Sequence, residues 1–450
     1  MHARTLIAAI WLCLLAAFIA AGTIWVGFHG DEEMQIAFST DFWILAEDAN
    51  LSALTSGNGA YERLINGNLN RYAIGLSLWL TGHNREEIPT RSQWDWTATD
   101  NENWLMGKVP SADTVLAARA SSTLFTAWSV VILFGLTTHI IGFRIAFLVS
   151  ALYTFNPWVL ENGRRAMMEG SMLCFGLLVV WLAAIIALQR TRGQPVRLIT
   201  WVGFIVAGAL ALASKHTAVV FVGAALAWVA LAEVWRTGAT WRTLFTWALR
   251  PILAGMFVFG LFIALSPALW RDIPSRLVDL VNLRSELLAR QAANLQEFTL
   301  SPIERLNWTI TLPFSKRYIR RDLASLPPND QYRAYVDSGL SGAVYNNTLI
   351  GSLLTLLAGI SGVVEGIRLV RGSDPLRKVR FVGIGVLFVF VCATLVINQL
   401  PWERYFLPLI PVACLMVGFG VAQLTTLVMP IIARLHAFQP TNAPNSTALA

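Results

Sequence analysis

Charged residues are scarce in this chain of 450 residues. They make up 14% of the sequence, whereas hydrophobic residues make up 55%. Soluble domains carry roughly 25% charged residues, and a soluble fold of this length could not bury so much apolar surface. The composition therefore excludes a soluble globular protein and places the chain in a lipid bilayer.

Cysteine is also rare, and each of the four cysteines lies inside an apolar run, where cysteine behaves as a small hydrophobic residue. These are Cys13, Cys174, Cys392 and Cys414. They predict no disulfide framework. The sequence lacks an internal repeat of fixed period, which excludes a solenoid. It also lacks a basic patch interleaved with aromatic residues, so no nucleic-acid partner is predicted.

Long apolar runs dominate the sequence instead. A helix needs about 20 apolar residues to cross a hydrocarbon core of roughly 30 Å, and about ten runs are candidates. They are 6–28, 115–141, 145–160, 171–188, 198–213, 218–234, 251–269, 347–370, 381–397 and 406–432. The first is too long for a secretory signal and is predicted to be retained. The predicted fold class is all-α, a polytopic transmembrane helix bundle of about ten spans.

Basic residues in short connections indicate the orientation of the spans, because the cytoplasmic side carries the excess of Lys and Arg. They fall in alternate connections: Arg144; Arg190, Arg192 and Arg197; Arg236 and Arg242; Arg371, Arg377, Lys378 and Arg380. Both termini are therefore predicted to be cytoplasmic, in a membrane of the bacterial inner-membrane type. The extracytoplasmic regions are then 30–114, 271–345 and 398–405.

The predicted organisation has four parts. Residues 1–275 form a transmembrane module that includes the acidic first loop, 30–114. Residues 276–346 form a second extracytoplasmic loop region, 347–434 the C-terminal spans, and 435–450 a tail whose composition predicts disorder. Stretches of the first loop are rich in large apolar residues and suit interfacial helices in the headgroup region.

The segment His29-Gly30-Asp31-Glu32-Glu33 stands where the first span leaves the membrane. Partly desolvated carboxylates at such an interface suit work as a general base. A second explanation is that acidic residues simply mark the outer end of a helix. The segment alone does not decide between them.

Two further clusters lie at the ends of spans. Arg165 and Glu169 are four positions apart, which predicts either a structural ion pair on one helix face or two groups presented to a cleft. Lys215 and His216 interrupt an apolar stretch. The lysine either extends to the interface or binds an anion, for which a phosphate headgroup is the natural ligand.

Arg404 and Tyr405 stand at the outer mouth of the last span, followed by Pro408 and Pro411. An arginine offers a planar fork of donors that suits phosphate. Anchoring in the aromatic belt explains the tyrosine but not the paired prolines.

In this order, the pieces resemble the multi-span glycosyltransferases of the GT-C type, particularly the family 39 relatives of protein O-mannosyltransferases and aminoarabinose transferases. The resemblance rests on motifs in family order: Asp31-Glu32, Ala118-Arg119-Ala120-Ser121-Ser122, Asn156-Pro157, Arg165-Ala166-Met167-Met168-Glu169, Gly208-Ala209-Leu210-Ala211-Leu212-Ala213-Ser214-Lys215, residues 267–274, and Arg404-Tyr405-Phe406-Leu407-Pro408-Leu409-Ile410-Pro411.

The resemblance implies a membrane glycosyltransferase that uses a sugar on a polyprenyl phosphate and transfers it, with inversion, to an acceptor hydroxyl at the extracytoplasmic face. It implies that Asp31 is the base and that Glu169 orients the acceptor or the base. Donor-phosphate and substrate binding fall to a further set, in which cations stabilise the departing phosphate. That set is Glu32, Arg165, Lys215, His216, Arg404 and Tyr405.

The chain departs from the family pattern in two places. Residues 66–71 replace the His-Pro-Pro-like element that many relatives carry, and the chain stops soon after its last span without a large soluble domain. The acceptor, whether protein, lipid or glycan, is therefore not specified. No cofactor is predicted, and although an acidic site can hold a divalent cation, no metal site is predicted.

Two other classes of function stay open. One is a catalytically silent relative that serves as a structural subunit of a membrane assembly. The other is a transporter or flippase, which is less favoured because such proteins place ionisable residues near the bilayer midplane and often have repeated halves. In this sequence the ionisable residues cluster at the ends of spans.

Overall fold

The computed structural model describes most of the chain, and every regular element in the described residues is a helix. The described residues are 2–55, 60–237, 241–294, 300–314, 334–342, 348–397, 400 and 402–437. The predicted tail, 435–450, lies outside the described residues except for 435–437.

The helices of the bundle are α1 (His2–Ala21), α8 (Ala112–Ile140), α9 (Phe143–Thr154), α10 (Pro157–Arg164), α11 (Glu169–Thr191), α12 (Leu198–Ser214), α13 (Val219–Thr237), α14 (Trp241–Ala264), α19 (Thr348–Arg371), α20 (Pro375–Ile397) and α21 (Leu409–Ala437). The helices of the loops are α2 (Gly30–Phe38), α3 (Asp41–Ala46), α4 (Leu51–Thr55), α5 (Ala60–Ile65), α6 (Leu69–Leu80), α7 (Asp100–Leu105), α15 (Ile273–Asn294) and α16 (Pro302–Thr311). Short 3₁₀ turns join them: η1 (Arg85–Glu87), η2 (His216–Ala218), η3 (Pro267–Leu269), η5 (Leu312–Phe314), η6 (Gly339–Ser341) and η8 (Glu403–Tyr405).

Within the described residues, seven helices are long and apolar enough to cross a membrane, or up to eight if the bent pair α9 and α10 is one span. The bend of 63° in that pair falls at Asn156-Pro157, because proline can begin a helix but cannot continue the preceding one. The apolar parts of α12 and α14 are shorter. Each apolar run of the sequence thus lies mainly on helices, although α1 ends seven residues before the first run does, and the chain is an integral membrane protein.

Helix α11 lies at the centre of the bundle, against α8, α12 and α13. Its buried residues are small or aliphatic along much of its length, including Ala183, Ala184 and Ala187, which lets neighbouring helices approach closely. Helix α13 also packs on α20, where the Trp228 indole donates to the Val379 carbonyl at 2.9 Å. The main hydrophobic core runs through these contacts.

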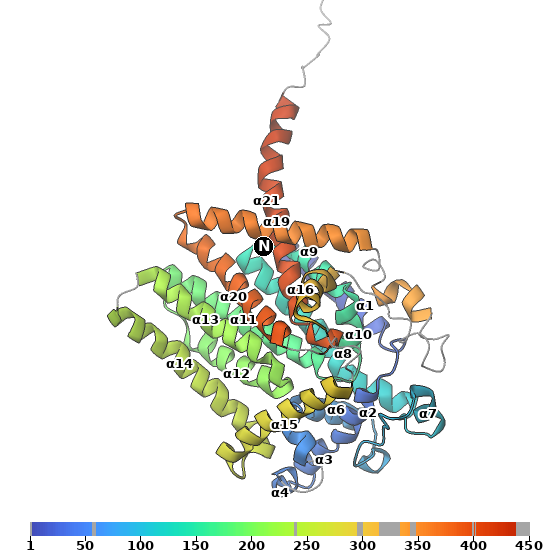
Figure 1. Ribbon diagram of the computed structural model, residues 1–450. Helices are drawn as coiled ribbons and strands as arrows, with labels where there is room; N and C mark the ends of the chain where they lie inside the picture. Colours follow the sequence, from blue (N-terminus) through green and yellow to red (C-terminus); the bar gives the residue numbers. More distant parts are fainter. Residues whose placement is uncertain are drawn as a thin grey trace, which may run out of the picture.

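The helices of the first loop form a layer at one end of the bundle. Figure 1 shows α2, α3, α4, α6 and α7 gathered there, with α15 crossing the same end. This layer has a core of its own around Ile36, Trp43, Ile74 and Leu78. The loop is therefore a packed cap over the bundle.

Arg164, at the end of α10, fixes the point where the chain leaves α1. Its guanidinium donates to the Phe18 and Ile19 carbonyls at 2.7 and 2.8 Å, and to the Tyr335 hydroxyl at 2.9 Å. Such charge-assisted bonds are roughly twice as strong as neutral ones. Arg164, at the end of α10, therefore fixes the position of the end of α1, from which the first loop starts.

Candidate functional site

The first turn of α2 places three carboxylates side by side. His29 is the N-cap, and its side chain accepts from the backbone of the first turn, while Glu32 accepts from the His29 N–H at 3.1 Å. Acidic residues also favour a helix N-terminus because they oppose its partial positive charge. Capping and the helix dipole are sufficient to explain the three acidic residues. The cluster alone therefore does not identify a functional site.

The surroundings of the three carboxylates separate their roles. Glu33 is buried and accepts from the Ser92 hydroxyl and from the Gln93 N–H at 2.8 Å, which holds the first loop together. Glu32 is fully buried and Asp31 is 14% exposed. Asp31 is thus the carboxylate of this turn that reaches the outer surface.

Glu32 is held by Arg119 on α8. The Arg119 Nε and Nη2 atoms each donate to one Glu32 oxygen at 2.8 Å, and the Ala166 N–H donates to Oε1 at 2.8 Å. Arg119 Nη1 donates to the Thr23 and Val26 carbonyls at 3.0 Å. Both carboxylate oxygens of Glu32 are occupied by protein donors, which favours a structural role over the substrate binding implied by the resemblance.

Asp31 is paired with Arg404 of η8. The Arg404 Nη1 atom contacts Asp31 Oδ2, and the two side chains are 20% and 14% exposed. Burial lowers the pKa of Arg404, because desolvation disfavours a charged group, and an anionic partner offsets that cost. Two residues far apart in the sequence meet at this point.

His29 completes the surroundings of Asp31. Burial, followed by the positive charges of Arg165 and Arg404, lowers the pKa of His29 well below its ordinary value. The imidazole is therefore neutral near pH 7, and its Nδ1 accepts the Asp31 N–H at 3.1 Å. His29 orients α2 and adds no positive charge to the site.

Glu169 and Lys215 form a second pair. Lys215 Nζ lies 2.5 Å from Glu169 Oε1, and both side chains are buried. Glu169 Oε2 has no hydrogen-bond partner among the described residues. Lys215 Nζ also lies 5.7 Å from the Tyr405 ring, within the range of a cation–π contact.

Tyr405 joins the two pairs into one polar chain, Asp31–Arg404–Tyr405–Lys215–Glu169. The Arg404 guanidinium lies 6.0 Å from the Tyr405 ring and 4.8 Å from that of Trp402, which stacks on Tyr405. This polar chain brings together α2, η8, the end of α12 and the start of α11. The sequence predicted each of its five members as a site residue.

The two remaining predicted site residues lie beside this polar chain. Arg165 does not share a helix face with Glu169, because α10 ends at Arg164 and Arg165 has an extended backbone before α11 begins. Its partners are instead Glu161, at 3.0 Å, and the Gly27 carbonyl, at 3.0 Å. Of the two alternatives for Arg165 and Glu169, the ion pair on one helix face was wrong for this reason. His216 packs against Phe262.

The turn between α5 and α6 packs on the end of α12 next to Lys215. A Cβ atom at Gly67 would overlap the Ser214 carbonyl, so only glycine permits this approach. The Asn68 side-chain amide donates to the Leu265 carbonyl at 2.5 Å. The first loop therefore forms one wall of the region around the polar chain.

A buried ion cluster in this wall was not predicted. Asp41 accepts from Arg71 Nη1 at 2.9 Å and from Arg63 Nη2 at 2.7 Å. Buried charges must be paired, so this cluster fixes α3, α5 and α6 together. The pairing of Arg119 with Glu32 was not predicted either. The sequence named Arg119 only within a motif, and no pattern in the neighbouring residues links it to Glu32, 87 positions away.

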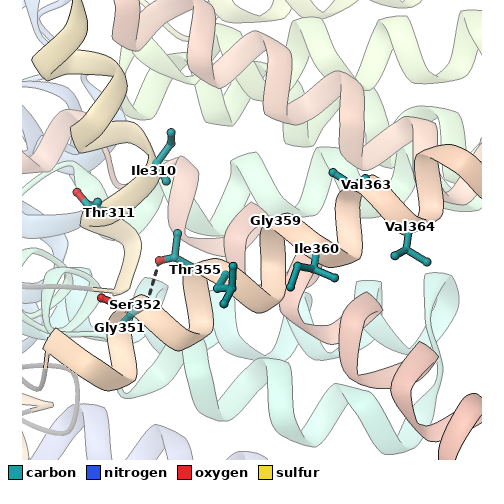
Figure 2. A pocket seen from close by; sticks show the side chains of 10 residues that line it. Ile310, Thr311, Gly351, Ser352, Thr355, Gly359, Ile360, Val363 and Val364 are labelled. Atoms are coloured by element: carbon teal, nitrogen blue, oxygen red, sulfur yellow. Dashed lines mark hydrogen bonds between the residues drawn. The ribbon is translucent and has the colours of Figure 1, made fainter.

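An apolar groove of about 610 Å³ lies elsewhere, between α16 and α19. Figure 2 shows Ile310 and Thr311 facing a row on α19 in which the Thr355 hydroxyl donates to the Gly351 carbonyl at 2.9 Å. Its volume suits a ligand, but none of its lining residues is charged or belongs to the polar chain.

Within the described part of the protein, no group of three or more His, Cys, Asp or Glu side chains converges as metal ligands would. The carboxylates nearest the site are each paired with a basic side chain. This donor set does not fit a divalent cation, and no metal-assisted step is derived from it.

No family model and no curated protein matches the sequence, but solved structures do. The Archaeoglobus fulgidus oligosaccharyltransferase in complex with zinc and sulfate is 11% identical, with a TM-score of 0.52 over 96% of this chain and 52% of that chain. Cupriavidus metallidurans ArnT bound to undecaprenyl phosphate is 13% identical, with a TM-score of 0.42 over 95% of this chain and 80% of that one. The Saccharomyces cerevisiae protein O-mannosyltransferase complex bound to its sugar donor is 14% identical, with a TM-score of 0.40 over 59% and 34%.

This chain spans about half the length of the oligosaccharyltransferase and about a third of the yeast protein. The chain shares an all-α polytopic fold with the oligosaccharyltransferase, which confirms the fold class predicted from the sequence.

Proposed function

We propose that this chain transfers a sugar from a polyprenyl-phosphate donor to an acceptor hydroxyl at the extracytoplasmic face, with inversion at the anomeric carbon. The observation that carries the proposal is the polar chain from Asp31 to Glu169. It combines one partly exposed carboxylate with two cations whose side chains are 20% exposed or less. A base and anion-binding groups within one site are what displacement of a phosphate requires.

In the proposed reaction, Asp31 takes the proton of the acceptor hydroxyl. The hydroxyl oxygen then attacks the anomeric carbon from the side opposite the phosphate. The bond between the anomeric carbon and the phosphate oxygen breaks, and the electron pair leaves with the polyprenyl phosphate. Arg404 and Lys215 stabilise the negative charge that develops on this leaving group, where preorganised cations have most effect.

The Asp31–Arg404 pair has a consequence for this reaction. A carboxylate that is bonded to a guanidinium is a weaker base than a free one, because the cation favours its ionised form. A phosphate oxygen competes for the same fork of donors. Donor binding would therefore draw Arg404 from Asp31 and leave the carboxylate free to accept a proton.

Glu169 Oε2 is buried without a partner in the described structure, and Lys215 occupies the other oxygen. A buried oxygen without a hydrogen-bond donor costs free energy. The hydroxyl group that receives the sugar, or a hydroxyl of the sugar itself, would donate to this oxygen. This supports an orienting role for Glu169.

The groove beside α19 has no cation to hold a phosphate, so the proposal does not depend on it.

The direct test is turnover by the purified chain in liposomes. Given an undecaprenyl-phosphate sugar labelled in the sugar, the protein should release undecaprenyl phosphate and pass the label to an acceptor extract. A transporter or a silent structural subunit would move or bind the lipid without breaking its glycosyl bond. Intact donor after prolonged incubation with a range of sugars and acceptors would refute the proposal.

Arg404→Gln should weaken binding of undecaprenyl phosphate by roughly 10- to 100-fold. The estimate follows from the loss of a charge-assisted hydrogen bond of about 1.5–3 kcal/mol. The measurement is lipid affinity in detergent micelles. Arg290→Gln is the matched control, because that side chain is 68% exposed on α15 and contacts only Glu286 among the ion pairs described. Equal affinity for both variants would remove Arg404 from the phosphate site.

A further inference from the structure

Two neutral amides, Gln35 on α2 and Asn70 on α6, are buried between these helices with polar atoms left unpaired. Gln35 is 1% exposed and Asn70 is 0% exposed. The bond that joins them, from Asn70 Nδ2 to Gln35 Oε1, is long at 3.5 Å. Gln35 Nε2 and Asn70 Oδ1 have no hydrogen-bond partner in the part of the chain that the structure describes.

Such atoms are rare, because nearly all buried polar groups in folded proteins are paired. Here one donor and one acceptor are left over together, from two side chains that already touch. Turning over both amides exchanges their oxygen and nitrogen atoms but again leaves one donor and one acceptor. The amide pair is therefore prepared for a partner that both donates and accepts.

The elements that carry the amide pair also adjoin the proposed active site. Gln35 follows Asp31 by four residues on α2, so the two side chains share one face of that helix. Asn70 follows Gly67, which packs on the Ser214 carbonyl next to Lys215. The buried pair thus lies between the helix that carries the candidate base and the turn that packs on the end of α12.

The unpaired atoms identify the ligand chemistry. A hydroxyl group donates one hydrogen bond and accepts others, so it satisfies Gln35 Nε2 and Asn70 Oδ1 at once. A phosphate that offers only acceptors would leave Asn70 Oδ1 unpaired, and a hydrocarbon chain would leave both. The neighbouring Arg71 is paired with Asp41 at 2.9 Å, and its Nε atom is also buried without a partner among the described residues. A further hydroxyl oxygen of the same ligand would accept from that atom.

We propose that Gln35 and Asn70 bind a hydroxyl of the sugar carried by the donor and so help to select that sugar. This rests on the proposed function, in which the anomeric carbon must lie near Asp31 and Asp31 itself holds the acceptor hydroxyl.

The test compares two kinds of lipid: bare undecaprenyl phosphate, and undecaprenyl phosphate that carries glucose, mannose, galactose or arabinose. Wild type should bind one of the sugar-bearing lipids more tightly than the bare lipid. Gln35→Met and Asn70→Leu, which keep side-chain size, should each reduce that extra affinity by about tenfold and leave affinity for the bare lipid unchanged. Each variant removes one buried unpaired atom but also leaves the other amide without its 3.5 Å partner, so a small fall in Tm is expected for both.

Asn101→Leu on α7 is the control, since Asn101 is an exposed amide of the same loop, and it should behave as wild type. If both variants keep the extra affinity for the sugar, or if wild type shows none, the amide pair does not bind sugar and the inference is wrong. A fall in Tm with the extra affinity retained would mean that the pair is purely structural. If wild type binds neither lipid, the proposed function fails first.

Discussion

Asp31→Asn is expected to slow sugar transfer by roughly 100- to 10,000-fold, the usual contribution of a general base. The amide cannot take the proton of the acceptor hydroxyl, although its oxygen can still accept from Arg404. The cap of α2 is unaffected, because the bond from residue 31 to His29 Nδ1 comes from the backbone N–H. The variant should therefore fold, with a Tm below that of wild type because Arg404 loses its anionic partner.

A second measurement separates loss of the base from damage to the site. Affinity of Asp31→Asn for undecaprenyl phosphate should equal or exceed that of wild type, because Arg404 loses an anionic competitor for the phosphate. The rate should thus fall without weaker donor binding. Asp95→Asn is the control on the same loop, where Asp95 is 40% exposed and lies 3.5 Å from Lys108. A normal transfer rate in Asp31→Asn would eliminate Asp31 as the base.

The helices were predictable because apolar runs of this length have few other structures available in a bilayer. The number of spans was harder to predict. Helix α12 and the apolar part of α14 are shorter than a full span, and the bend at Asn156-Pro157 divides another run into α9 and α10. Composition identifies the runs, but their lengths and bends depend on packing.

Residue type and position identified the five members of the polar chain as candidates, but their pairing could not be predicted. Asp31 and Arg404 are 373 positions apart, and nothing local indicates that they meet. Where the sequence suggested a local pair, Arg165 with Glu169, the end of α10 and the extended backbone at Arg165 separate them. Helical spacing predicts contacts only where one helix continues.

The amide pair could not be predicted from the sequence for another reason. Gln35 and Asn70 carry no charge and stand in ordinary helical stretches, so residue type gives no signal. Their significance comes from burial without full pairing, which is a property of the folded protein. Likewise, the acidic residues in the first turn of α2 look equivalent in the sequence. Only the side chains with which they pair in the folded protein distinguish Asp31 from Glu32.

Arg119→Met is expected to destabilise the folded protein by about 3–5 kcal/mol, the cost of leaving one member of a buried ion pair without the other. Glu32 would keep the N–H groups of Ala166 and His29 but would remain a buried anion without a cation. The carbonyls of Thr23 and Val26 would also lose their donor. The measurement is thermal unfolding in detergent, with Arg290→Met as the exposed control.

The double variant Arg119→Met with Glu32→Gln separates the unpaired charge from the lost packing. Because it leaves no buried charge, it should be more stable than Arg119→Met alone, although the free carbonyls keep it below wild type. Glu32→Gln alone should lower the Tm without changing lipid affinity measured well below the transition. A normal Tm with weaker donor binding would instead place Glu32 in the substrate site and contradict the structural role argued from its four protein donors.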